Sequence, residues 1–211
     1  MLTARKLVKR AGQCHHLQYD EAGWNNLVHT PLLDAVFNDG DPNGTQLVDF
    51  SPWCVSYVSK TRLLAMINTN SMTASVSSRF HYFPIPATKV DYVLYLDAGA
   101  EDACTNDAIA KLEETTGSVN HTGFTPLTSH PISVSIETKR HGGDGRRADV
   151  QMAAWQAAQW SFLEAQAGGA VDNLAFLPGV IVQGHEWKFV ATTRKDNKTV
   201  STAPLTRAYA C

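Results

Sequence analysis

The stretch VSIETKR, residues 134–140, combines a run typical of a β-strand with an acid and a base. Alternate side chains of a strand point to opposite faces of its sheet. Glu137 and Lys139 therefore share one face with Ser135, and the residues between them point the other way. A carboxylate and an ammonium on the inner face of a sheet are costly to bury unless they are paired or serve a function. The stretch marks a candidate site.

The length and composition of the chain are those of a globular protein. The 211 residues are 44% hydrophobic and 18% charged, which predicts a single domain spanning 1–211 with one core. The formal net charge of −2 gives no hint of a polyanionic partner. The four cysteines are scattered without a CxxC pair, which favours a reducing compartment over a disulfide scaffold or zinc knuckle.

The beginning of the sequence, MLTARKLVKRAGQ, is basic and contains no acid. It has no apolar run of signal-peptide length, and nothing in the sequence reaches the length needed to span a bilayer. We interpret this segment as the start of a helix rather than a transit peptide. We expect an intracellular protein, cytoplasmic or nuclear.

Hydrophobic periodicity predicts a mixed α/β chain in which helices cover a sheet. Apolar residues at helical spacing fill 16–37, and Pro31 is expected to divide or kink this helical region. The further expected elements, in chain order, are strand-like residues at 45–67 with a helix at their end, a loop at 68–79, a strand at 89–98, an acidic insertion at 99–131 with a helix around 105–115, a strand at 132–140, a helix at 148–169, and two strands at 175–184 and 186–194. The closing residues show no clear pattern.

A second carboxylate, Asp91, lies near the start of the expected strand 89–98. If this strand pairs with strand 132–140, Asp91 and Glu137 converge at one position of the sheet. Mg²⁺ and Mn²⁺ prefer oxygen ligands, often one or two carboxylates with waters or phosphates. Lys139 is placed to offset charge that develops on a phosphoryl group. Two other interpretations are open: Glu137 and Lys139 form a plain ion pair, or Asp49 in LVDF takes the position of Asp91.

Several further motifs occur in a fixed order along the chain. They are Glu21-Ala-Gly-Trp24-Asn25, Val28-His29, Val90-Asp91-Tyr92, Ile136-Glu137-Thr138-Lys139, Gln151 through Trp155-Gln156, and Leu177-Pro178 through Gln183-Gly184-His185. This set resembles the PD-(D/E)XK nuclease superfamily, and in particular fungal proteins with PD-(D/E)XK nuclease-like domains. The resemblance covers most of residues 20–193. It implies a restriction-endonuclease-like core, with a mixed central β-sheet flanked by helices.

The resemblance also implies roles for individual residues. Asp91 and Glu137 are metal ligands for Mg²⁺ or Mn²⁺, and Lys139 is the catalytic lysine. Gln151 corresponds to a glutamine that relatives direct at the site, although it could also cap its helix, and Glu21 is an additional acid that reaches the metal. Two features depart from the family: 46 residues separate Asp91 from Glu137, and the chain ends soon after Thr193. We therefore expect a truncated or divergent C-terminal end.

The segment HGGDGRR, residues 141–147, precedes the helix at 148–169. Arg146 and Arg147 at a helix N-terminus are candidate phosphate-binding residues. A solvated loop is the competing interpretation, because the segment lacks the spacing of a phosphate-binding Walker motif. Trp155 and Trp160 are about 140° apart on this helix, which favours core packing over a shared stacking surface.

These observations favour a metal-dependent phosphodiesterase, a nuclease-type hydrolase that acts on nucleic acid. The low positive charge counts against it, because Lys and Arg contacts to phosphates supply most non-specific affinity. Basic residues in 1–10, 139–147 and 188–198 would have to provide those contacts. Two alternatives keep the fold and change the function. One is an enzyme that acts on a small molecule, for instance in fungal specialised metabolism, and the other is a catalytically inactive interaction module.

Overall fold

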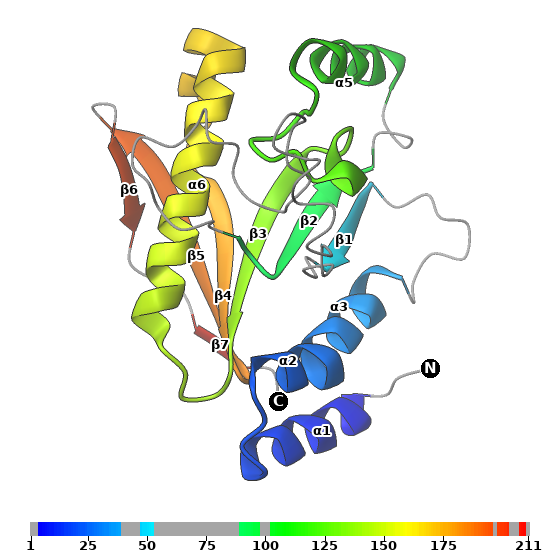
Figure 1. Cartoon of the computed structure of the whole chain (residues 1–211), viewed down its shortest axis with the longest axis vertical. Coiled ribbons are helices and arrows are strands. Elements are labelled where there is room, and N and C mark those ends of the chain that lie inside the picture. The colour runs from blue at the N-terminus through cyan, green and yellow to red at the C-terminus, as the bar shows by residue number, and fades with distance from the viewer. Residues whose placement is uncertain are drawn as a thin grey trace, which may run out of the picture.

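The computed structural model describes residues 4–38, 47–52, 89–97, 102–195, 198–202 and 207–209. Most of the expected strand-like stretch 45–67 and the expected loop at 68–79 lie outside these residues. A sheet with the order β1-β2-β3-β4-β5-β6 forms the centre, and β7 pairs with β5 (Figure 1). The strands are β1 (Val48–Pro52), β2 (Tyr92–Leu96), β3 (Ile132–Lys139), β4 (Leu177–Gln183), β5 (Glu186–Lys195), β6 (Lys198–Thr202) and β7 (Arg207–Tyr209).

One strand pair of this sheet is parallel and the others are antiparallel, so the sheet is mixed. The parallel pair is β3 and β4, with Glu137 opposite Ile181 and Lys139 opposite Gln183. Parallel neighbours require a crossover connection, and the long helix α6 (Gly145–Ala167) provides it. The expected mixed sheet flanked by helices is confirmed.

Helix α6 covers one face of the sheet. Asp144 caps its start by accepting a hydrogen bond from the Arg147 N–H, and the helix ends at Gly168, where φ is +53°. Apolar side chains of α6 pack against alternate residues of the strands, including Val93, Ile181 and Val190. Trp155 and Trp160 are both buried, as core packing requires. A 3₁₀ turn, η6 (Gly168–Asn173), follows the helix.

The N-terminal helices cover the opposite face. Leu33 packs there against Tyr92, Ile136 and Val182, which point away from α6. The helices are α1 (Ala4–His16), α2 (Glu21–Trp24), the π-helical segment η1 (Asn25–His29) and α3 (Thr30–Phe37). In Figure 1 this group lies at the end of the sheet where β3 and β4 finish. The three layers place Glu21 close to the C-terminal end of β3.

The break in the N-terminal helical region differs from the expected one at Pro31. The chain turns after α1, where Gln18 has φ of 54° and Asp20 caps α2 by accepting from the Gly23 N–H. The helix continues through Pro31. This residue lies in the first turn of α3, the position at which a helix tolerates proline. The π-helical turn immediately before it shifts the hydrogen-bond register, with Thr30 N–H donating to the Asn25 carbonyl.

The acidic insertion contains the expected helix and folds back onto the sheet. Helix α5 (Ala103–Thr116) starts at the N-cap Asp102 and ends at Gly117, where φ is 80°. A 3₁₀ turn, η5 (Thr125–Leu127), follows. The buried Asn120 side chain donates to the Leu127 carbonyl at 2.6 Å and accepts from the Ile132 N–H at 2.9 Å. These bonds fix the insertion to the start of β3.

The end of the chain differs from the sequence expectation, since β6 and β7 form in a segment without a clear pattern. Both strands pair with β5, which supplies the template for them. Among the residues that the structure describes, no helix has the length and apolar character needed to cross a membrane.

Candidate active site

Glu137 and Lys139 lie at the C-terminal end of β3, on the face covered by α6. The antiparallel register of β2 and β3 pairs Tyr92 with Ile136, so the next step of the register sets Asp91 opposite Glu137. The Asp91 N–H donates to the Ile136 carbonyl at 3.0 Å, which holds Asp91 beside β3 immediately before β2 begins. Residues opposite each other in an antiparallel pair point to the same face. The two carboxylates from neighbouring strands therefore meet at one end of the sheet.

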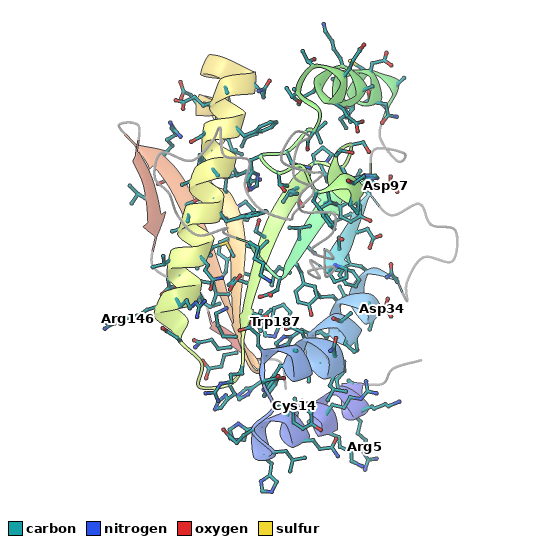
Figure 2. All side chains as sticks on the ribbon, viewed as in Figure 1. Arg5, Cys14, Asp34, Asp97, Arg146 and Trp187 are labelled. Carbon is teal, nitrogen blue, oxygen red and sulfur yellow. The ribbon has the colours of Figure 1, made fainter. Side chains whose placement is uncertain are left out.

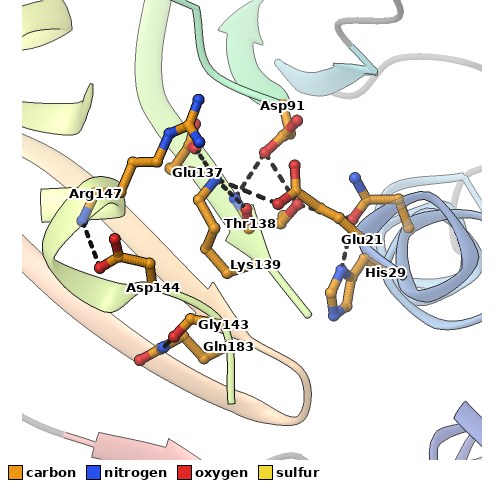
Figure 3. Close-up of polar contacts among 11 residues, drawn as sticks. Glu21, His29, Asp91, Glu137, Thr138, Lys139, Gly143, Asp144, Arg147 and Gln183 are labelled. Atoms are coloured by element: carbon orange, nitrogen blue, oxygen red, sulfur yellow. Dashed lines mark hydrogen bonds and ion pairs between the residues drawn. The ribbon is translucent and has the colours of Figure 1, made fainter. Parts of the chain in front are cut away.

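The Lys139 ammonium lies among carboxylates (Figure 3). Its Nζ is 2.5 Å from Glu137 Oε1 and 3.3 Å from Glu21 Oε2, and it donates to the Thr138 carbonyl at 2.8 Å. Glu21 is the first residue of α2, so the positive end of that helix stabilises its charge. The exposed fraction of the side chain rises from 2% at Glu137 to 10% at Lys139 and 42% at Glu21. The group therefore opens to solvent on the side of Glu21.

Asp91 is held by a single neighbour on β3. Its Oδ2 accepts hydrogen bonds from the backbone N–H of Thr138 at 2.8 Å and from Thr138 Oγ1 at 2.9 Å. Asp49, the alternative to Asp91, lies in β1 on the far side of β2. It accepts from Tyr95 Oη at 2.9 Å, and burial together with this bond raises the pKa of Tyr95 to about 12. The geometry therefore favours Asp91 over Asp49.

The buried position of Glu137 changes its protonation. Burial, followed by the charge of Asp91, raises the pKa of Glu137 to about 8, while Lys139 acts in the opposite direction. Burial alone lowers the pKa of Lys139, but its hydrogen bond and charge interaction with Glu137 outweigh that effect, so this pKa is raised. The excess of carboxylates over ammonium groups makes the site a strong attractor for cations.

Comparison with known proteins assigns the family. Residues 1–210 match the profile of the PD-(D/E)XK nuclease superfamily. The chain belongs to this superfamily. Searches of curated proteins and of solved structures found no match. The assignment of Asp91, Glu137 and Lys139 to the motif of this superfamily stays a prediction.

The side-chain chemistry of this PD-(D/E)XK site fits a divalent cation. The site offers carboxylate oxygens of Asp91, Glu137 and Glu21, which are the hard ligands that Mg²⁺ and Mn²⁺ prefer. Within the described residues, however, no group of three His, Cys, Asp or Glu side chains is already arranged around a common metal position. Glu137 and Glu21 are instead both paired with the Lys139 ammonium.

Gln151, the predicted glutamine of the site, lies in the first turns of α6. Along this helix Gln159 Nε2 donates to the Ile132 carbonyl at 3.1 Å, and Trp155 Nε1 donates to Ser135 Oγ at 2.8 Å. Gln151 lies four residues before Trp155, a distance of about 6 Å along the helix, which is nearly the length of two strand residues. This register brings Gln151 to the level of Glu137. Its Oε1 is buried and has no hydrogen-bond partner in the described part of the chain. An acceptor in that state fits a ligand or its water shell.

The two arginines are less closely connected to the carboxylates. Arg146 and Arg147 are exposed, and Figure 2 shows Arg146 projecting outward from the first turn of α6. Figure 3 shows the Arg147 side chain extending toward the strand that carries Glu137. The loop before them is fixed by Gln183 Nε2, which donates to the Gly143 carbonyl at 3.0 Å. A phosphate-binding role stays a prediction for both arginines.

Three polar side chains that were not among the predicted site residues connect to Asp91, directly or through one another. The Thr138 side chain touches Asp91, Asn25 touches Thr138 at 2.8 Å, and His29 touches Asn25 at 2.8 Å. The Trp24-Asn25 and Val28-His29 motifs were the available signal. Their spacing alone gives no reason to connect them to Asp91, since 62 or more residues separate the two segments.

Proposed function

We propose that this protein is a metal-dependent phosphodiesterase that hydrolyses nucleic acid. The observation that carries the proposal is the Lys139 ammonium, which lies within 3.3 Å of two carboxylates and beside a third, at the strand ends of a PD-(D/E)XK chain. A buried charged group of this kind is expensive to maintain for stability alone. A buried carboxylate with a raised pKa, such as Glu137, beside a lysine is typical of catalytic sites.

Each residue of the site has a distinct task in this proposal. Asp91 and Glu137 would hold Mg²⁺ or Mn²⁺, with Glu21 as a further ligand at the solvent side. Such an ion polarises a phosphoryl oxygen and favours ionisation of a nearby water. Lys139 carries its charge on the Glu137 side of the strand, where it offsets negative charge on the phosphate. Gln151 Oε1 supplies a neutral acceptor that orients a water or a ligand.

A basic surface near the site supports a polyanionic substrate. Arg5, Lys6 and Lys9 of α1 are exposed. The C-terminal end of α1 reaches the loop after β3, where the rings of His15 and His141 lie 4.3 Å apart. The helix that carries Arg5, Lys6 and Lys9 thus contacts the basic stretch 139–147 through its C-terminal end. Phosphates of a nucleic-acid strand would find positive charge on the approach to the site.

The test compares metal binding and cleavage in wild type and in matched variants. Calorimetric titration with Mn²⁺ and Mg²⁺ is combined with cleavage of mixed single-stranded and double-stranded DNA and RNA. Asp91→Ala and Glu137→Ala are expected to lose both binding and cleavage, since each removes a proposed ligand. Asp49→Ala is the control, because Asp49 is a carboxylate of the neighbouring strand that is bound to Tyr95. Equal activity of Asp91→Ala and wild type would contradict the proposal.

A small phosphodiester is the second candidate substrate, and the net charge of −2 favours it. An enzyme for a small molecule needs no extended basic surface and can use the same carboxylates and lysine. The assay therefore includes bis(p-nitrophenyl) phosphate. Cleavage of this ester without cleavage of any nucleic acid, lost in Glu137→Ala, would favour the second candidate. Failure to bind either divalent ion would favour an inactive interaction module.

A further inference from the structure

A chain of hydrogen bonds runs from Asp91 to the opposite face of the sheet and ends at the turn between β4 and β5. Thr138 Oγ1 lies 2.9 Å from Asp91 Oδ2 and 2.8 Å from the side-chain amide of Asn25. The same amide lies 2.8 Å from His29 Nδ1. His29 Nε2 lies 2.7 Å from the Gly184 carbonyl oxygen. One carboxylate of the site is thus connected through three side chains to a turn distant in the sequence.

The backbone around Asn25 and His29 has an unusual conformation that serves this chain. Both residues belong to the π-helical turn η1, between α2 and α3. Turns of this kind are rare and occur most often at functional sites. The widened turn places Asn25 and His29, four residues apart, with their side chains in direct contact. It directs both toward β3 and the β4–β5 turn rather than along the helix axis.

His29 has little freedom within this arrangement. Its side chain is fully buried, stacked against the Trp24 ring at 5.8 Å and edge-on to the Trp187 ring at 6.0 Å. Burial lowers the pKa of His29, opposed by its bond to Gly184 and by the charge of Asp91. A neutral imidazole has one N–H donor and one acceptor nitrogen. The contacts of the two nitrogens therefore define which one carries the hydrogen.

The number of hydrogens on each group determines the donor and the acceptor in each of these hydrogen bonds. The Gly184 carbonyl only accepts, so His29 Nε2 is the donor and Nδ1 must accept from Asn25. The Thr138 hydroxyl has one hydrogen, and an ionised Asp91 Oδ2 requires it. Asn25 must therefore donate to Thr138 as well. In the structure the Asn25 atom in both contacts is Oδ1. Only the amide nitrogen has two hydrogens to give, so we infer that the amide group is rotated by 180° and that Nδ2 faces both neighbours.

We propose that Asn25 and His29 are positioning residues that fix the Asp91 carboxylate through Thr138. His29 holds the Asn25 amide in one orientation, and Asn25 then directs the Thr138 hydroxyl hydrogen at Asp91 Oδ2. With the Thr138 N–H also donating to Oδ2, the carboxylate is fixed, and within the described residues its Oδ1 remains for a further ligand. Only the identity of that ligand, a divalent metal ion, rests on the proposed function. Among the described contacts, neither side chain bonds to the proposed ligands Glu137 and Glu21, and Asn25 meets Glu21 through the helical bond from its backbone N–H to the Glu21 carbonyl.

The first measurement tests the arrangement without any metal. Long-range ¹⁵N–¹H NMR on the full chain at pH 7.5 reports the tautomer of His29, and the carboxyl ¹³C shift reports Asp91, assigned by its loss in Asp91→Asn. The expected result is a neutral His29 with hydrogen on Nε2, and an Asp91 signal that moves in Asn25→Ala. Asn25→Asp places an acceptor next to Nδ1, so His29 is expected to become doubly protonated. A wild-type His29 with hydrogen on Nδ1 would overturn the proposal.

The second measurement uses Mn²⁺ affinity, with a variant in the same helix–sheet contact as a control. Asn25→Ala is expected to weaken Mn²⁺ binding about tenfold or more, the usual effect of removing a residue that orients a metal ligand. Thr30→Val removes the 2.8 Å bond between Thr30 and Tyr92 and leaves the chain to Asp91 intact. It is expected to change the affinity less than about twofold. Equal weakening in both variants would mean that only the helix contact matters and would overturn the inference.

A double-mutant cycle identifies Thr138 as the intermediate. If Asn25 acts through Thr138, Asn25→Ala together with Thr138→Val weakens binding no more than Thr138→Val alone. Additive losses would show separate action and overturn the inference. If wild type binds no Mn²⁺, the proposed function fails, and the positioning role is then decided by the Asp91 signal. An Asp91 shift that is the same in wild type and Asn25→Ala would overturn that role as well.

Discussion

Glu137 and Lys139 form an ion pair with 2.5 Å between Oε1 and Nζ, and only 2% and 10% of the two side chains are exposed. Their β-strand spacing of two residues makes the contact unavoidable once both point to the same face. Desolvation offsets much of the attraction of a buried pair, so the pair itself adds little stability. Its consequence is a lysine whose charge is fixed at the end of β3, next to Asp91 and Glu21.

Removal of Lys139 is expected to destabilise the fold. Lys139→Met leaves Glu137 buried without its cation, which costs about 3 kcal/mol in comparable pairs. The full loss is expected above the Glu137 pKa of about 8, because protonation of Glu137 limits the loss at lower pH. Urea denaturation at pH 9 measures it. The control is Lys188→Met, which breaks a more exposed pair with Asp149 and is expected to cost less than about 1 kcal/mol. Equal losses would contradict the buried character of the Lys139 pair.

Glu137 is expected to make stability depend on pH. Its pKa rises from 4.5 in the unfolded chain to about 8 in the fold, so the folded state binds the extra proton between these values. This contribution is complete below about pH 4.5 and is lost as the pH rises through about 8. Wild type is therefore expected to lose stability relative to Glu137→Gln between pH 5 and 8, by a few kcal/mol. Urea midpoints across this range measure the difference, and parallel curves would contradict the raised pKa.

Much of the sheet and part of the site follow from the sequence because they depend on local patterns. The alternation around Glu137 identifies β3, and the alanine-rich run after residue 147 identifies α6. The spacing of Glu137 and Lys139 is set by one strand, so their shared face is predictable. Asp91 is predictable once the two strands pair, because the apolar run after it identifies the strand that begins there.

The interactions that connect distant segments do not follow from local patterns. His29 binds the carbonyl of Gly184, which is 155 residues away, and no periodicity contains that contact. The π-helical turn at Asn25 depends on tertiary contacts with Thr138 and on the proline that follows. Strands β6 and β7 form although their sequences lack a strong alternation, because both pair with β5. Tertiary context decided each of these features.

Binding of a divalent ion is expected to release a proton from the site. Glu137 is largely protonated below its pKa of about 8, and a metal ligand must be ionised. Mn²⁺ affinity is therefore expected to rise between pH 6.5 and 8 and to level off above. Calorimetry in two buffers of different ionisation enthalpy counts the protons released. Glu137→Gln is expected to abolish the release and most of the binding. Release that persists in Glu137→Gln would place the titrating group elsewhere.

Gln151 and Gln159 offer a matched comparison on one side of α6. Gln159 Nε2 donates to the Ile132 carbonyl at 3.1 Å, whereas Gln151 Oε1 is buried without a partner in the described residues. A buried acceptor without a hydrogen bond costs about 1–3 kcal/mol. Gln151→Met is therefore expected to leave stability unchanged or raise it by about 1 kcal/mol. Gln159→Met is expected to lower stability by about 1 kcal/mol, because it removes a bond that the fold uses.

Metal binding and cleavage are expected to show the opposite order, with the larger loss in Gln151→Met and the smaller loss in Gln159→Met. If Gln151 Oε1 binds a ligand or its water, Gln151→Met weakens Mn²⁺ binding or cleavage about tenfold or more in spite of its stability. Gln159→Met is expected to keep both within about twofold, since its side chain faces the start of β3. Thermal unfolding and Mn²⁺ titration on the same samples separate the two effects. Loss of stability in Gln151→Met with unchanged binding would give Gln151 a structural role and remove it from the site.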